Sequence, residues 1–225
     1  MPSKKSKLKK KSRKPSGKTT TIKEIQASFR PKLKICVSGA AAGECVRFGK
    51  DKAYDVGKAI AEQGAIIVTG ATKGIPTHAA KGAKEAGGFS IGFSPAATEA
   101  EHLRSYRLPM EYLDMVVFTG FNYAGRNLLL TRASDAVITV CGRIGTLNEF
   151  TVAFEDNKVQ GVLLGSGGIT TEIEHILNVA KRGFGKVIFD TDPERLVRKV
   201  VKAIKREKRE EKLAMNRKNH NRNKR

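Results

Sequence analysis

Residues 136–149 read AVITVCGRIGTLNE, and the rest of the chain repeats the pattern of this stretch. The apolar run from Ala136 to Cys141 predicts a buried strand, and the turn Gly142-Arg143-Ile144-Gly145-Thr146 follows it directly. Thr146 then opens a segment with apolar residues at helical spacing. Glycine lets backbone N–H groups approach an anion closely, and the following helix N-terminus adds a favourable dipole. The stretch therefore predicts a strand, a phosphate-binding turn and a helix in succession.

The same alternation of strand and helix recurs along the chain. Continuous Ile- and Val-rich runs predict strands over residues 33–37, 65–69, 89–93, 115–119, 136–141, 162–164 and 187–190. Runs of this kind are typical of strands covered on both faces, as in a parallel sheet. Helical spacing predicts helices over 52–63, 77–86, 122–134, 146–156, 170–181 and 193–209, the last with Asp192 as N-cap and Pro193 in its first turn. We therefore expect an α/β, doubly wound, Rossmann-like fold, with a mostly parallel sheet of about seven strands and helices on both faces.

The net charge of +21 is concentrated at the two ends of the 225-residue chain. Residues 1–20 hold nine Lys or Arg and no acid, and residues 205–225 hold ten basic and three acidic residues. We expect a disordered basic tail over 1–21, a Rossmann-like nucleotide-binding domain over 22–204, and a basic helix end and tail over 205–225, disordered from residue 216. Such tails would contact the phosphate backbone of RNA or DNA without sequence preference.

Cysteine spacing and hydropathy indicate the cellular compartment of the protein. Cys36, Cys45 and Cys141 form no CxxC pair, which argues against a disulfide framework and a zinc site. We expect Cys36 and Cys141 to be buried small hydrophobes. No run of about 18 apolar residues occurs, so no membrane span is expected. The sequence thus predicts a cytoplasmic protein with no membrane contact and no zinc site.

Four Gly-rich turns follow predicted strands, at residues 38–43, 69–74, 119–126 and 141–146. Ligands of open α/β sheets bind beyond the carboxyl ends of the strands. We therefore expect a shared crevice with a phosphate- or nucleotide-binding set: Gly39, Gly70, Gly74, Gly142, Arg143, Gly145 and Thr146. Any one turn is also explained as a simple strand-to-helix connection. None matches a Walker loop or a clean GxGxxG, which argues against an ordinary NAD site.

Two charged residues near these turns each have two interpretations. Glu149 lies three residues after Thr146, so the pair either forms a capping box or Glu149 faces the bound ligand. Arg126 lies near the start of an apolar helix, where it either clamps a phosphate or ribose or forms a surface salt bridge. Spacing alone does not decide between these alternatives.

The order of these residues resembles a known family. Arg126, then Ser134-Asp135-Ala136, then Gly142-x-x-Gly145-Thr146-x-x-Glu149 resemble the Lonely Guy family, whose members were long mislabelled as lysine decarboxylases and whose signature is PGGxGTxxE. The resemblance spans roughly residues 33–190, within the Rossmann-like SLOG superfamily that also includes a domain of the DNA-processing protein DprA.

The resemblance implies a phosphoribohydrolase. Members of the family split the N-glycosidic bond of a nucleoside 5′-monophosphate into a free base and ribose 5-phosphate, without a metal or redox cofactor. Arg126 and Glu149 would be the catalytic pair, and the Gly-Thr turn would hold the 5′-phosphate. The resemblance also implies a homodimer, with helices 122–134 and 146–156 near the interface.

Departures from the signature indicate a divergent member. Cys141-Gly142-Arg143 replaces Pro-Gly-Gly, Asn148 replaces a usually acidic residue, and the earlier turn has Ala71 and Thr72 where glycines are common. The Arg143 side chain either supplements phosphate binding or fills the pocket. Two alternatives to the enzyme therefore stay open: a non-catalytic nucleotide sensor or binder using the same crevice, and a DprA-like nucleic-acid-binding protein.

Overall fold

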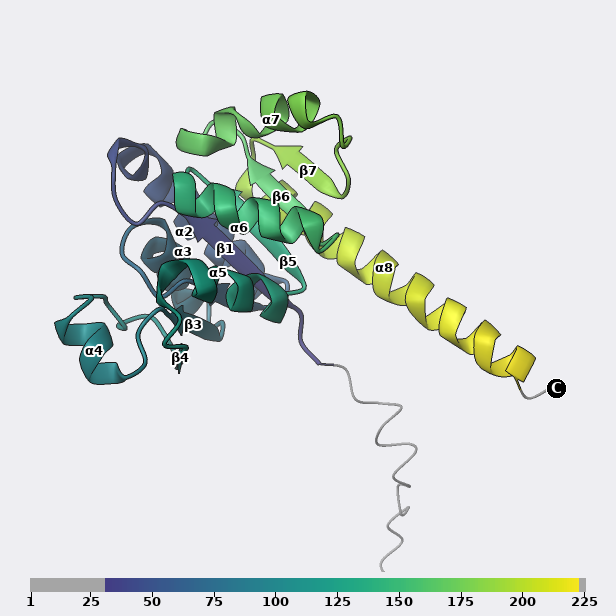
Figure 1. The fold of residues 1–225 in the computed structure, drawn as a ribbon, viewed down its shortest axis with the longest axis horizontal. Helices are drawn as coiled ribbons and strands as arrows, with labels where there is room; N and C mark the ends of the chain where they lie inside the picture. Colours follow the sequence, from purple (N-terminus) through teal and green to yellow (C-terminus); the bar gives the residue numbers. More distant parts are fainter. Residues whose placement is uncertain (1–30, 223–225) are drawn as a thin grey trace, which may run out of the picture. The chain divides into compact units, whose positions relative to one another are not determined.

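Seven strands form one parallel sheet in the computed structural model, which describes residues 31–222. Their order across the sheet is β4-β3-β2-β1-β5-β6-β7 (Figure 1). The strands are β1 Lys34–Gly39, β2 Ile66–Thr69, β3 Ser90–Ser94, β4 Met115–Phe118, β5 Ala136–Val140, β6 Val159–Leu163 and β7 Val187–Asp190. All seven predicted strands are confirmed, and β6 begins somewhat earlier than the apolar run indicated. The tail predicted over residues 1–21 lies outside the described residues.

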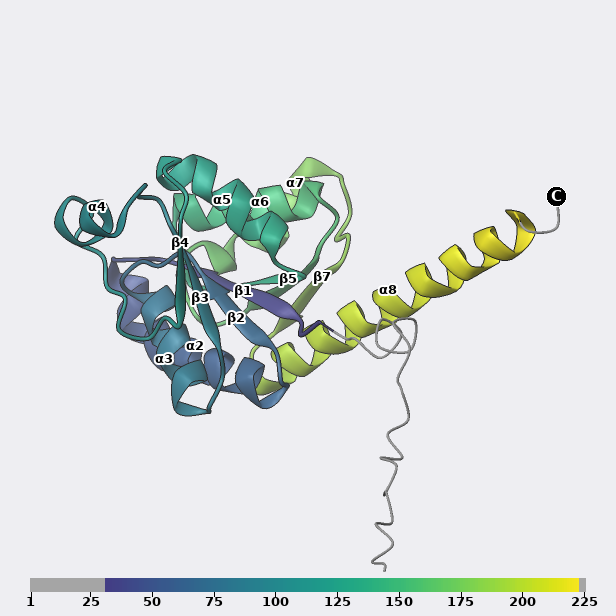
Figure 2. The same ribbon diagram turned by 90° about the horizontal axis from the view of Figure 1, so that it is seen from below.

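Helices cover both faces of the sheet (Figure 2). The helices α2 Glu44–Glu62, α3 Ile75–Glu85 and α8 Pro193–Arg222 pack on one face. The helices α5 Asn122–Ala133, α6 Ile144–Glu155 and α7 Ile173–Ala180 pack on the other. The predicted doubly wound α/β architecture is therefore confirmed.

The central strands explain why their sequences are apolar without alternation. β5 is buried at every position. On one face, Ile138 of β5 packs with Ile60 of α2 and Val200 of α8. On the other face, its neighbour Val137 packs with Leu130 of α5. Successive side chains of a strand point to opposite faces, so a strand covered by helices on both sides needs apolar residues at every position.

Two helices differ from the prediction. Helix α2 begins at Glu44, well before the predicted start at residue 52. Its first turns were missed because four charged residues and Gly49 interrupt the apolar pattern over residues 44–51. Gly49 is closely packed there, since a Cβ would lie 3.1 Å from Ile75 Cδ1 and 3.2 Å from Cys141 Cβ. The helix predicted over 170–181 is a 3-10 turn, Gly168–Thr171, followed by α7. A short helix, α4 Glu99–Arg104, was not predicted.

Helix α8 is longer than expected. It continues to Arg222. The prediction that the chain is disordered from residue 216 is therefore wrong for residues 216–222. The predicted N-cap is confirmed, because Asp192 Oδ1 accepts a hydrogen bond from Arg195 N at 2.6 Å. Lys208 farther along binds Asp135 at 2.8 Å, at the start of β5. Within residues 31–222, we find no helix with the length and apolar character needed to cross a membrane.

Candidate functional site

Strands β1 and β5 lie side by side at the point where the strand order reverses. The chain proceeds from β1 to β2, β3 and β4 toward one edge of the sheet, and from β5 to β6 and β7 toward the other. Such a switch point leaves a crevice at the carboxyl ends of the two strands. A cavity of about 350 Å³ lies there, lined by the turns that follow β1, β2 and β5 and by helices α5 and α6.

Most of the predicted site residues surround this cavity. The residues that line it are Gly39, Gly70, Arg126, Arg143, Gly145, Thr146 and Glu149. The other two, Gly74 and Gly142, do not line it. Both have positive φ angles, 72° and 113°, and a Cβ would lie 2.5 Å from Ala40 O at Gly74 and 2.6 Å from Thr146 Cγ2 at Gly142. Their glycine identity is therefore explained by the path of the turns.

Glu149 is a buried carboxylate on α6, with 7% of its surface exposed. Ser38 Oγ, at the end of β1, donates a hydrogen bond to its Oε2. With the Asn127 amide oriented to suit its neighbours, Nδ2 donates to Glu149 Oε1 at 2.9 Å. Burial raises the pKa of Glu149 above its ordinary value, although the Arg126 charge and the Ser38 hydrogen bond oppose this effect. The site therefore holds a carboxyl group whose charged form is disfavoured by burial.

The alternative role of Glu149 as a capping residue is wrong. Arg143 is the N-cap of α6, and its N–H donates to Thr146 Oγ1 at 3.3 Å. Glu149 instead faces the cavity with Ser38. Of the two interpretations that spacing left open, the structure retains the one in which Glu149 faces the crevice.

Arg126 lies on α5 with only 4% of its surface exposed. Its Nη1 donates to the Phe93 carbonyl at 3.3 Å, and its guanidinium lies 5.9 Å from the centroid of the Tyr123 ring. A Cβ at Gly70 would lie within 1.8 Å of Nη1, so the glycine makes room for the guanidinium. Arg126 is therefore not in a surface salt bridge, and that alternative is wrong.

The Nε atom of Arg126 is buried and has no hydrogen-bond partner among the described residues. A buried polar nitrogen without a partner is costly, and such groups commonly mark a position that a ligand or water completes. Because Arg126 lines the same cavity as Glu149, the unpaired nitrogen and the buried carboxylate belong to one site. The arrangement offers a fixed positive charge and a proton-accepting group to a bound molecule.

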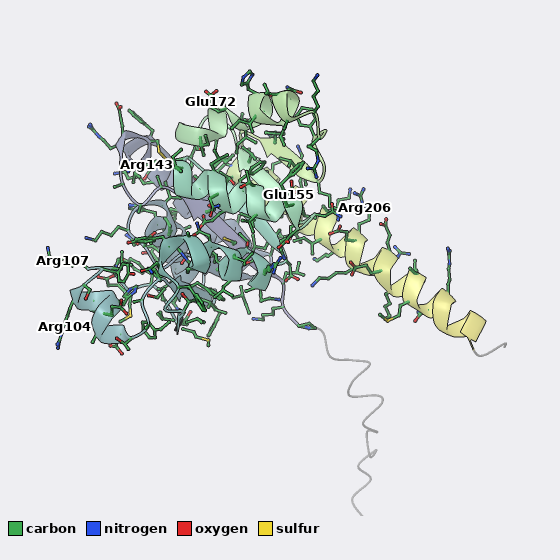
Figure 3. The ribbon with its side chains drawn as sticks, in the orientation of Figure 1. Arg104, Arg107, Arg143, Glu155, Glu172 and Arg206 are labelled. Carbon is green, nitrogen blue, oxygen red and sulfur yellow. A yellow bond between two sulfur atoms is a disulfide. The ribbon has the colours of Figure 1, made fainter. Side chains whose placement is uncertain are left out.

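The turn after β5 forms the other wall of the cavity. It leads into α6, whose first N–H groups have no partner within the helix and can bind an anion. No atom lies within 4 Å of a Cβ built at Gly145, so this part of the turn is open. Arg143 is exposed at the N-terminal end of α6, close to Gly43 (Figure 3). Its side chain therefore borders the mouth of the cavity.

A disulfide joins Cys45 at the start of α2 to Cys141 at the end of β5, with 5.9 Å between the two Cα atoms. The expectation that Cys141 is a simple buried thiol is therefore wrong, whereas Cys36 is buried and unpaired as expected. Cys45 lies just after the loop 39–43, and Cys141 lies just before the turn 142–146. The disulfide therefore links the ends of two segments that line the cavity.

The predicted site set did not include three polar residues of the cavity that lie near Arg126 or Glu149: Ser38, Tyr123 and Asn127. Ser38 is the first residue of the Gly-rich turn predicted over 38–43, beside the switch point, so its position held a usable signal. Asn127 follows Arg126 directly and also contacts Asn148, at 2.9 Å. A contact of this kind depends on how α5 packs against α6, which residue spacing alone does not specify.

A model of the SLOG cluster4 family matches residues 32–197. The chain belongs to the SLOG cluster4 family. An uncharacterised protein of Archaeoglobus fulgidus is 34% identical to this SLOG protein over 126 residues, which are 56% of this chain and 76% of the relative. The match places the whole cavity, from Val37 to Glu149, inside the family region.

Solved structures with this SLOG fold include proteins of different function. The molybdenum cofactor binding protein of Rippkaea orientalis is 27% identical, with a TM-score of 0.61 over 77% of this chain and 98% of that chain. DNA processing protein A of Helicobacter pylori is 18% identical, with a TM-score of 0.56 over 76% of this chain and 81% of that chain, and shares the fold alone. The match to the SLOG cluster4 model confirms the predicted SLOG superfamily.

Proposed function

We propose that the cavity binds a nucleoside 5′-monophosphate and hydrolyses its N-glycosidic bond, as the Lonely Guy resemblance implies. The observation that carries the proposal is the pairing of Arg126, with its unpartnered buried Nε, and Glu149 in one cavity beside a helix N-terminus. Arg126 and Glu149 would be the catalytic residues. No metal or redox cofactor takes part in this chemistry.

The 5′-phosphate would bind at the turn Gly142–Thr146. The free N–H groups at the start of α6 and its helix dipole favour a dianion there. Arg143 would add a positive charge from the mouth of the cavity. The open space at Gly145 supports this assignment, because a phosphate oxygen can approach the backbone directly.

The reaction would develop positive charge on the ribose as the C1′–N bond breaks. An ionised Glu149 stabilises that charge and takes a proton from the attacking water, whose oxygen bonds to C1′. The electron pair of the broken bond goes to the base, which then receives the proton. Ser38 and Asn127, which donate to the two oxygens of Glu149, would hold the carboxylate in position.

The direct test is to incubate purified protein with AMP, GMP, CMP, UMP and dAMP and to separate the products by chromatography. The proposal predicts free base and ribose 5-phosphate from at least one nucleotide, and loss of this activity in Glu149→Ala. If no base is released, or if Glu149→Ala is as active as the wild type, hydrolysis is not the function of the cavity.

A second candidate is a binder that carries a phosphorylated heterocycle without hydrolysing it. The likeness to a molybdenum cofactor binding protein at 27% identity favours this candidate. Arg143 in place of the signature glycine also favours it, since the added side chain narrows the mouth of the cavity. Thermal-shift measurements with nucleotides and with the molybdenum cofactor would test it: stabilisation without turnover supports the carrier, and no shift with any of them excludes it.

We also propose that the protein forms a homodimer through α5 and α6. Leu128 and Leu129 on α5 are 38% exposed, and Ile144 at the start of α6 is 78% exposed. Exposed apolar residues on adjoining helices are typical of a protein interface. Light scattering on the purified chain should give twice the monomer mass of 24.6 kDa, and Leu128→Glu with Leu129→Glu should give the monomer.

A further inference from the structure

Helix α8 has two halves with different surroundings. Its first half packs on the sheet through Leu196, Val197, Val200, Val201 and Ile204. From residue 205 to 217 nearly every side chain is exposed, and both views show this half extending past the sheet and its other helices (Figure 1, Figure 2). The second half of α8 is therefore a long helical surface that the described part of the chain does not cover.

The exposed charges of α8 are sorted by sign around the helix. Between Lys202 and Arg217, at about 100° per residue, an arc of about 140° contains six basic residues and no acid. We call this arc the basic face of α8; its members are Lys202, Lys205, Arg206, Arg209, Lys212 and Arg217. Glu207, Glu210 and Glu211 lie outside the arc.

The basic face points away from the sheet. Ile204 and Val200, on the buried side of α8, lie about half a turn from Arg209. Glu207 and Lys208, also off the basic face, bind Lys186 and Asp135 and so tie the middle of α8 to the sheet. Within the described residues, Arg206 alone of the basic face is near an acid, with its Nε 4.0 Å from Glu210. The charges of this face are thus available to an outside partner.

The chemistry of the surface identifies the class of partner. A helix that binds a lipid surface needs an apolar side opposite its charges, but residues 205–217 place glutamates there and have few apolar residues. Single-stranded nucleic acids are commonly held by stacking on aromatic rings, and α8 contains no Phe, Tyr or Trp. A row of cations about 22 Å long, at 1.5 Å per residue, suits the regularly spaced phosphates of a duplex.

We infer that the basic face of α8 binds the phosphate backbone of a nucleic-acid duplex, without reading the base sequence. This binding is independent of the cavity at the switch point. The binding surface is one face of a folded helix, and this face begins at Lys202. The inference is therefore distinct from a general attraction of nucleic acid to charged tails. Backbone contacts of this kind release counterions, which makes affinity fall steeply as salt concentration rises.

The test compares two charge-matched triple variants of the full chain. Lys205→Glu, Arg209→Glu and Lys212→Glu together alter the basic face. The control combines Arg47→Glu, Lys50→Glu and Lys181→Glu, which are exposed residues of α2 and the end of α7 without an ion-pair partner in the described part of the chain. Fluorescence anisotropy with a labelled duplex of about 20 base pairs, as DNA and as RNA, measures the affinity from 50 to 300 mM salt.

The basic-face variant should bind both duplexes at least about tenfold more weakly than the wild type at 100 mM salt, with a salt slope smaller by two to three. The control should stay within about threefold of the wild type. Equal losses in the two variants would show an effect of net charge alone, and an unchanged basic-face variant would assign the binding to another part of the chain. Either result overturns the inference, as does wild-type binding to anionic phospholipid vesicles with none to either duplex.

Discussion

Ser38 and Glu149 lie 111 residues apart in the chain, and Ser38 Oγ donates a hydrogen bond to the Glu149 carboxylate. The contact joins the end of β1 to helix α6 across the switch point of the sheet. It holds a buried carboxylate beside Arg126, a residue of a third element, α5.

The first prediction concerns the charge of Glu149. Glu149→Gln keeps the shape of the side chain and removes the carboxylate, so nucleotide should still bind while hydrolysis falls by roughly 10²–10³-fold. Single-turnover release of base, together with calorimetric binding, separates the two effects. Glu155→Gln, at the exposed end of the same helix, is the control and should retain full activity. Equal loss of binding and hydrolysis in Glu149→Gln would contradict the role given to the carboxylate.

The second prediction concerns Arg126, whose replacement should weaken nucleotide binding without lowering the stability of the protein. Its buried Nε has no partner among the described residues, so Arg126→Met, made in a Glu149→Gln background that leaves no unpaired carboxylate behind, should leave the melting temperature of the ligand-free protein unchanged or higher. Nucleotide affinity should fall at least about tenfold, because the variant lacks a buried charge-assisted contact. Arg132→Met, on the same helix but exposed and bound to Asp156, should change neither quantity much. A large loss of stability from Arg126→Met in the ligand-free Glu149→Gln background would show that Arg126 has a structural role instead.

The third prediction concerns pH. Because burial raises the pKa of Glu149, the ionised form required for catalysis appears only as pH rises through that raised value. Hydrolysis should therefore increase with pH along an acid limb displaced above the usual range of a glutamate. Ser38→Ala removes a hydrogen bond that favours the charged form of Glu149, so the pKa of Glu149 should rise further and the acid limb should move to higher pH. Ser38→Thr keeps a hydroxyl group and should restore the wild-type profile. A pH profile unaffected by Ser38→Ala would contradict the proposed control of Glu149.

The same shift has a consequence for stability. A carboxyl group with a raised folded-state pKa contributes stability that is complete below its unfolded pKa and is lost as pH rises through the folded value. Measured by urea denaturation, the free energy of unfolding of the wild type should therefore decline relative to that of Glu149→Gln as pH rises over that interval. Asp190 acts in the opposite direction, because Arg195 and Lys199 lower its pKa; its contribution is present above its ordinary pKa and is lost in acid.

The fourth prediction concerns the disulfide between Cys45 and Cys141. It closes a loop with a sequence separation of 96, for which the chain-entropy model gives a stabilisation of about 4.7 kcal/mol. Cys45→Ser should therefore lower the free energy of unfolding under oxidising conditions and have much less effect in reductant. Cys36→Ala, which alters the unpaired cysteine, should have the same effect with and without reductant. Urea denaturation in both conditions makes the comparison, and a Cys45→Ser effect independent of reductant would argue against the bond.

The sequence predicted those features whose signals are local. The apolar run 136–141 and the turn after it predicted β5 and the entry to α6, and Arg126 was placed on the correct helix. Features that depend on packing between distant segments were missed. The disulfide requires α2 to approach the end of β5, and the Ser38–Glu149 contact requires β1 to lie under α6. Gly74 and Gly142 show a further limit, since a glycine needed for backbone conformation looks the same in sequence as one that lines a cavity.

The most direct test of the account is a crystal structure of Glu149→Gln soaked with AMP, in which binding is retained and hydrolysis is blocked. The account predicts the 5′-phosphate within hydrogen-bonding distance of the backbone N–H groups of Gly145 and Thr146, and the ribose between Arg126 and Gln at position 149. A nucleotide bound elsewhere, or with its phosphate away from this turn, would contradict the central claim that the cavity at the switch point is a nucleoside 5′-monophosphate site.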